Sequence, residues 1–185
     1  MAYRNGTYVV FHAQNTSDPT KSDMKYYRLL TAWHEHSDIE FKMINSHDKT
    51  SAVRDSSKRA TLQSRIRERL NNSRNMLLII GSTTHLDDDN VPFEISYAVD
   101  KCGIPIIAAY TGYDSICTPS RLRYLWPNAL AARINNNTAK VIHVPFRKEP
   151  IKAALQKYDY QDPPKGSLVH YTQETFRKWG LLQPS

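Results

Sequence analysis

The chain has 185 residues, of which 40% are hydrophobic and 23% charged, and this composition predicts one globular domain with a core of its own. No apolar run approaches the roughly 20 residues of a membrane span, and the N-terminus lacks a signal segment, so we expect a cytoplasmic protein without a membrane partner. Much of the net charge of +7 lies on one segment, where a solvated helix face explains it more simply than nucleic-acid binding, because aromatic interleaving is absent. The basic residues of that segment are Lys58, Arg59, Arg65, Arg67, Arg69 and Arg74.

Apolar runs and amphipathic segments follow one another along the chain. The apolar runs predict strands at Tyr8–Ala13, Glu40–Asn45, Met76–Ile80, Ile104–Tyr110 and Lys140–Phe146. The amphipathic segments predict a helix capped by Asp23, a helix over Ser57–Asn72, a helix capped by Asp89 or Asn90 that runs to Cys102, and a helix over Glu149–Tyr158. We predict an α/β domain over residues 1–158 and a C-terminal extension over residues 159–185 that holds one short helix.

Five strands that alternate with helices predict a parallel sheet with right-handed crossovers, covered by helices on both faces. A flavodoxin-like three-layer sandwich with a five-stranded sheet of order 2-1-3-4-5 fits this pattern. In such a sheet ligands bind at the carboxyl ends of the strands, where the strand order reverses. We therefore expect the site between the first and third strands.

The helix after the third strand carries a glutamate that needs an explanation. Its apolar stripe consists of Val91, Ile95, Ala98, Val99 and Cys102. Glu94 lies about 60° from the centre of this stripe, so its carboxylate is expected in the first turn, at the border of the buried face and beside the end of a central strand. The structural alternative is a glutamate that only favours the positive end of the helix dipole.

Several common ligand-binding motifs are absent from the sequence. It contains no G-x-G-x-x-G, no G-x-x-x-x-G-K-[ST] and no G-x-S-x-G, and Gly81-Ser82 stands where a receiver domain needs an aspartate. Cys102 and Cys117 are the only cysteines, which is too few for a cysteine-based metal site. A flavin site stays open, because Thr16, Ser17 and Thr20 follow the first strand, but their spacing is too generic to predict one. We therefore expect neither a bound cofactor nor a metal.

One carboxylate, Glu94, remains among hydroxyl, amide and aromatic side chains. The candidate substrate-binding residues are His12, Asn15, Ser46, Ser82, Thr83, Phe93 and Tyr97, with packing and turn formation as their structural alternatives. A single carboxylate is too few for ordinary glycoside hydrolysis. It suffices when a neutral molecule leaves a cationic ring, as nicotinamide leaves NAD, because one ionised glutamate can stabilise the oxocarbenium-like transition state.

Three segments, YVVFHA, SRNMLLIIGSTT and VPFEISYAVDKCGIPIIAAY, make residues 7–158 resemble the TIR-like family typified by the Thoeris anti-phage protein ThsB. Phe93-Glu94-Ile95 matches the aromatic-Glu pattern of that family, so the resemblance implies that Glu94 is the catalytic residue. It also implies that NAD is a substrate, cleaved at the nicotinamide–ribose bond.

The resemblance further implies a cyclic or conjugated product derived from ADP-ribose, which diffuses to a separate effector and activates it during anti-phage defence. A phage-derived trigger and a homo-oligomer are compatible with this function.

Two other functions stay open. One is a non-catalytic TIR-like interaction module in which Glu94 is structural. The other is a nucleoside deoxyribosyltransferase-like enzyme that uses a glutamate on a related fold and ignores NAD.

Overall fold

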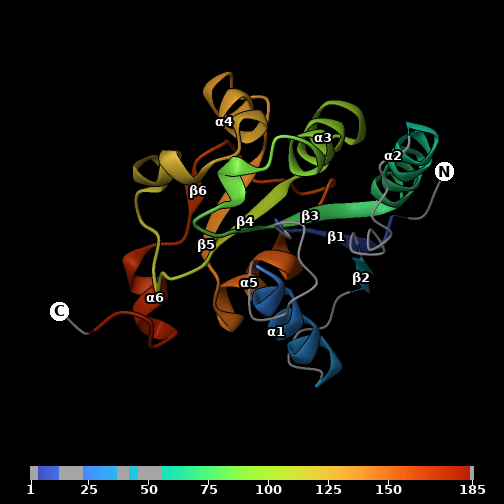
Figure 1. The fold of residues 1–185 in the computed structure, drawn as a ribbon. Helices are drawn as coiled ribbons and strands as arrows, with labels where there is room; N and C mark the ends of the chain where they lie inside the picture. The colour runs from blue at the N-terminus through green and yellow to red at the C-terminus, as the bar shows by residue number, and fades with distance from the viewer. Residues whose placement is uncertain (1–3, 13–22, 37–41, 46–55, 184–185) are drawn as a thin grey trace.

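The computed structural model of the chain describes residues 4–12, 23–36, 42–45 and 56–183. Its centre is a parallel sheet with the strand order β2-β1-β3-β4-β5-β6 (Figure 1). The strands are β1 (Gly6–Val10), β2 (Lys42–Asn45), β3 (Ser73–Ile80), β4 (Ile106–Tyr110), β5 (Val141–Pro145) and β6 (Val169–His170). The predicted order 2-1-3-4-5 is confirmed, and the C-terminal extension adds a sixth strand at the edge.

Helices cover both faces of the sheet, as the predicted three-layer α/β fold requires (Figure 1). One face is covered by α1 (Met24–Glu35) and α5 (Lys148–Lys157), and the other by α2 (Ser56–Asn71), α3 (Asn90–Tyr97) and α4 (Asn128–Asn135). Helix α6 (Gln173–Lys178) is the last helix of the described residues. Turns of 3-10 helix lie at Thr84–Leu86 and Pro119–Leu125.

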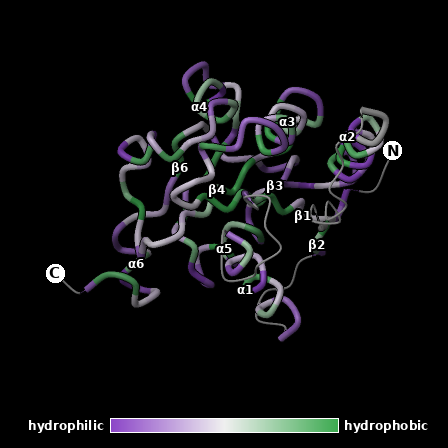
Figure 2. Tube along the Cα trace, viewed as in Figure 1, coloured by the Kyte–Doolittle hydropathy of each residue, from purple (hydrophilic) through white to green (hydrophobic). Residues whose placement is uncertain are grey.

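Alternation along the strands divides the apolar side chains between two cores. In β3, Met76, Leu78 and Ile80 face α2, α3 and α4, whereas Leu77 and Ile79 face α1 and α5. All five are completely buried, which confirms β3 as a strand covered on both faces. Figure 2 shows the same arrangement as hydrophobic strands between helices that carry hydrophilic outer faces.

The C-terminal extension packs on the sheet. Its strand β6 pairs with β5 through Ile142 and Val169, so every residue of β5 is buried even though we predicted β5 as the last strand. Phe176 of α6 is completely buried. The division at residue 158 stays a prediction, but the extension shares the sheet of the preceding domain.

Asp23 and Asp89 occupy the N-cap positions of α1 and α3 as predicted, but neither side chain caps its helix. The carboxylate of Asp23 makes no capping hydrogen bond to α1 and instead accepts one from Thr84. At α3 the side chain of Asp89 makes no cap either, because Asp87 Oδ1 accepts from the N–H groups of residues 89, 90 and 91 at 3.0, 3.1 and 3.3 Å. The predicted helix to Cys102 is α-helical only to Tyr97 and continues as a π-helical turn over Ala98–Cys102.

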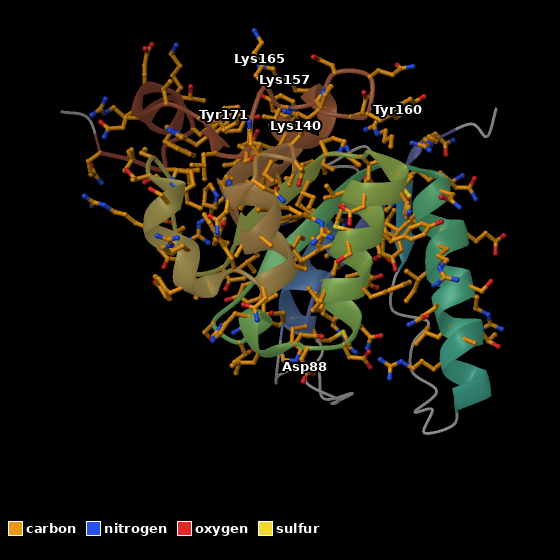
Figure 3. The ribbon with its side chains drawn as sticks, turned by 90° about the horizontal axis from the view of Figure 1, so that it is seen from above. Asp88, Lys140, Lys157, Tyr160, Lys165 and Tyr171 are labelled. Carbon is orange, nitrogen blue, oxygen red and sulfur yellow. The ribbon has the colours of Figure 1, made fainter. Side chains whose placement is uncertain are left out.

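The carboxyl ends of the parallel strands share one edge of the sheet with the N-terminal ends of α2 and α3. Figure 3 shows Asp88 at this edge, whereas Lys140, Lys157 and Tyr160 lie at the opposite edge. Among the described residues, no helix combines the length and the apolar character needed to cross a membrane.

Candidate functional site

Glu94 is completely buried between α3 and the sheet. Its side chain has 0% exposure, and its Oε1 accepts a hydrogen bond of 2.8 Å from the hydroxyl of Tyr8 on β1. Tyr8 also has 0% exposure. Burial raises the pKa of Tyr8 well above its usual value, and the negative charge of Glu94 raises it further. Tyr8 therefore keeps its proton and acts as the donor in this pair.

The local sequence explains why the two side chains meet. Val91 and Ile95 anchor α3 in the core, and they turn the adjacent Glu94 toward the sheet. In β1, alternation sends Tyr8 and Val10 to the face that α2 and α3 cover. We expected Glu94 in the first turn of the helix, at the border of the buried face. The structure puts it beyond the first turn of α3 and inside the core, so it is not a solvated residue that merely favours the helix dipole.

The loops after β1 and β3 meet at the carboxyl edge of the sheet. His12 Nδ1 and Thr83 Oγ1 lie 3.4 Å apart, and both residues are half-buried. Ser82 next to Thr83 is exposed. Two further candidates, Asn15 and Ser46, lie outside the described residues. At this edge the structure therefore brings together His12 and Thr83 from the set that we predicted.

Phe93 and Tyr97 contact each other and helix α2. Their rings are stacked with centroids 6.2 Å apart, and the guanidinium of Arg67 lies 5.6 Å from the Phe93 centroid and 6.0 Å from the Tyr97 centroid. The Tyr97 hydroxyl donates to Asn71 at 3.4 Å. These contacts are cation–π and stacking interactions that join α3 to α2, in agreement with the packing alternative for both aromatic residues.

Asp23 is a second buried carboxylate at this edge, and we predicted it only as a helix cap. It is 6% exposed, and its Oδ2 accepts from Thr84 Oγ1 at 3.1 Å. Burial raises the pKa of Asp23, while the hydrogen bond from Thr84 and the nearby His12 lower it. No sequence signal separates Asp23 from an ordinary capping aspartate, because its partner is 61 residues away in the chain.

Tyr8 was also missed as a candidate, although a signal for it was present. Alternation in YVVFHA puts Tyr8 and Val10 on one face of the strand, but the sequence does not say which helix covers that face.

Within the described parts of the chain, no three His, Cys, Asp or Glu side chains lie close enough to hold a metal ion. Both cysteines, Cys102 and Cys117, are free thiols.

A known family matches the part of the chain that carries these residues. The family described as "Thoeris protein ThsB, TIR-like domain" matches residues 8–115, which is more than half of the chain. The matched part runs from β1 past the end of β4 and includes Tyr8, His12, Thr83 and Glu94. The chain therefore belongs to the ThsB TIR-like domain family of Thoeris proteins.

Proposed function

We propose that this Thoeris TIR-like protein is an NAD-cleaving enzyme. In this proposal it releases nicotinamide and converts the remaining ADP-ribose moiety into a cyclic or conjugated second messenger that activates a separate effector in bacterial anti-phage defence. Glu94 is the catalytic residue. The reaction takes place in the cytoplasm, with NAD as substrate and without a resident cofactor.

The complete burial of Glu94 is the observation that carries this proposal. A carboxylate with 0% exposure costs several kcal/mol to desolvate unless hydrogen bonds compensate, whereas the same residue on the solvated face of α3 would cost nothing comparable. A glutamate that only favoured the helix dipole would gain about 0.3–1 kcal/mol in the first turn. The hydrogen bond from Tyr8 offsets part of this cost, but the helix dipole alone does not explain a buried carboxylate, which supports a chemical role for Glu94.

The proposed chemistry needs one anion and no general acid for the leaving group. The bond between the ribose anomeric carbon and the pyridinium nitrogen breaks, and its electron pair goes to the nitrogen, so nicotinamide leaves as a neutral molecule. The Glu94 carboxylate stabilises the positive charge that develops on the ribose. Water, a hydroxyl or a ring nitrogen then adds to the anomeric carbon and loses a proton to solvent, which gives ADP-ribose, a cyclic product or a conjugate.

Access to Glu94 requires a change in the surrounding structure. Because the side chain has no exposed surface, the ribose of NAD reaches it only after neighbouring side chains move. We propose that a phage-derived trigger, acting alone or through formation of a homo-oligomer, favours this open state. Basal turnover of the purified protein is then low and rises with the trigger.

The experiment is mass-resolved chromatography of NAD after incubation with the wild type and with Glu94→Gln, in buffer and in lysate from infected cells. We expect nicotinamide with the wild type only, and the mass of the second product names its class. Glu149→Gln is the control, because Glu149 is likewise a helical glutamate, in the first turn of α5, but it is exposed. The control variant should cleave NAD like the wild type.

Two results would contradict the proposal. Intact NAD in every sample, with all three proteins folded, would favour a non-catalytic interaction module. Release of a free base from deoxynucleosides, with NAD untouched, would favour a deoxyribosyltransferase-like enzyme instead.

A further inference from the structure

We propose that Tyr8 is the positioning residue for Glu94: its hydroxyl holds the carboxylate in the orientation and the ionised form that NAD cleavage needs. This inference rests on the proposed function. It concerns a residue that lies 86 positions from Glu94 in the chain and that meets it only through the fold. The 2.8 Å hydrogen bond from Tyr8 Oη to Glu94 Oε1 is the observation behind it.

Tyr8 lies on a strand that is paired on both sides. It lies in the middle of β1, where its backbone is paired with Ile44 of β2 on one side and with Met76 of β3 on the other. Its ring is completely buried in the core beneath α2 and α3. A donor on a strand that is paired on both sides cannot move without disturbing its two neighbours, so the Tyr8 hydroxyl is a fixed partner for the Glu94 side chain on α3.

The direction of the hydrogen bond defines what Tyr8 does. Burial and the charge of Glu94 raise the pKa of Tyr8 by more than the nearby Arg69 lowers it, so the Tyr8 oxygen keeps its proton at neutral pH. A neutral O–H that donates to a carboxylate stabilises the ionised form relative to the protonated form. Without the donor, the buried carboxylate takes up a proton more readily and loses its fixed orientation.

The test compares the pH dependence of NAD cleavage by the wild type, Tyr8→Phe and Tyr110→Phe, under whichever condition supports wild-type turnover. Tyr110→Phe is the matched control, since Tyr110 is also a completely buried tyrosine in the same core, but its hydroxyl contacts His143 and Trp126. We expect Tyr8→Phe to lower kcat roughly 10- to 100-fold near neutral pH and to leave KM within about twofold, because a hydrogen bond to a charged group is lost.

The decisive readout is the acidic limb of the pH–rate profile. In Tyr8→Phe this limb moves to higher pH by about one unit or more, and raising the pH restores part of the lost rate. In Tyr110→Phe the limb stays where it is in the wild type. A residue with a purely structural role would lower the amount of active protein at all pH values and would not move the limb.

A second variant keeps the test decisive if Tyr8→Phe folds poorly. Replacement of Tyr8 alone by 3-fluorotyrosine keeps the ring and the hydroxyl but makes the hydroxyl a stronger donor, so the acidic limb should move to lower pH. An unmoved limb in both Tyr8 variants, with wild-type turnover intact, would overturn the positioning role and leave the proposed function standing. Intact NAD with the wild type itself under every condition would overturn both.

Discussion

Thr84 and Asp23 connect the loop after β3 to the start of α1 through a hydrogen bond of 3.1 Å from Thr84 Oγ1 to Asp23 Oδ2. The same Thr84 oxygen accepts from the backbone N–H of Gly81 at 2.8 Å, and both polar side chains are buried. This arrangement fixes the loop that carries Thr83, and Thr83 in turn lies beside His12. Asp23 therefore holds the loop at the carboxyl edge of the sheet. It lies at the start of α1, which covers the other face of the sheet from α3 and Glu94.

Gly81→Ala should destabilise the protein. A Cβ atom at position 81 would lie 2.1 Å from Asp23 Oδ1, and the buried carboxylate has little room to move away. We expect a loss of about 1–3 kcal/mol in the free energy of unfolding, measured by urea denaturation. The loss should shrink when Asp23 is also replaced by Ala, because the two side chains then no longer collide.

Gly166→Ala is the control for that prediction. A Cβ atom at position 166 would have no heavy atom within 4 Å, so we expect a change within about 0.5 kcal/mol. Equal stabilities for the Gly81→Ala and Gly166→Ala variants would show that the contact between Gly81 and Asp23 does not constrain the loop.

The features that the sequence predicts well are those with a strong local pattern. Strand β3 is a continuous apolar run, and the stripe through Val91 and Ile95 has helical spacing, so both elements and the strand order follow from the chain alone. The predicted end of that helix at Cys102 is also confirmed, because Gly103 follows it with a φ of +62°, which residues with a side chain disfavour. Strand β6 has only two residues, and a pair of residues carries no periodicity.

The details of the site depend on contacts between distant segments, and local pattern does not contain them. The hydrogen bond from Tyr8 to Glu94 and the contact of Arg67 with Phe93 each join two elements whose relative rotation is set by the core. Three consecutive aspartates are equivalent caps in the sequence, but the backbone turn before α3 aims only Asp87 at the helix N–H groups.

Asp87→Ala should destabilise α3, the helix that carries Glu94. Asp87 Oδ1 accepts from three backbone N–H groups at the start of the helix, and these donors lose their partner in the variant. We expect a loss of about 1 kcal/mol in the free energy of unfolding. Asp88→Ala is the matched control, because Asp88 is exposed at the same edge (Figure 3) and should cost less than about 0.5 kcal/mol. A larger effect at Asp88 than at Asp87 would contradict this cap.

Phe176→Ala should destabilise the whole domain and not only the C-terminal extension. Phe176 is completely buried, with Tyr171 and Trp179 packed edge-on around its ring at 6.4 and 5.8 Å. We expect a loss of about 3–5 kcal/mol within a single thermal transition, because the extension supplies strand β6 to the common sheet. Leu168→Ala is the control, since Leu168 is 44% exposed. A separate, lower transition in Phe176→Ala would show that the extension unfolds independently.

The burial of His143 should lower the free energy of unfolding in mild acid. Its Nε2 lies 2.9 Å from the backbone oxygen of Ser167, which can only accept, so Nε2 carries the proton and Nδ1 accepts from the Tyr110 hydroxyl at 2.7 Å. The Tyr110 oxygen already accepts from Trp126 Nε1 at 2.7 Å. A second proton on His143, at Nδ1, would therefore meet a hydroxyl that already donates to this nitrogen and accepts from Trp126. Burial lowers the pKa of His143 to about 4.

The sign of the effect follows from the two pKa values. Between pH 6.5 and about 4 the unfolded chain binds a proton at His143 and the folded chain does not, so the free energy of unfolding decreases as the pH falls through this range. The decrease attributable to His143 is about 3 kcal/mol, measured by urea denaturation at a series of pH values. His143→Gln should remove this part of the pH dependence, whereas His36→Gln, at the exposed end of α1, should retain it. Parallel pH profiles for the wild type and His143→Gln would show that another group is responsible for acid sensitivity.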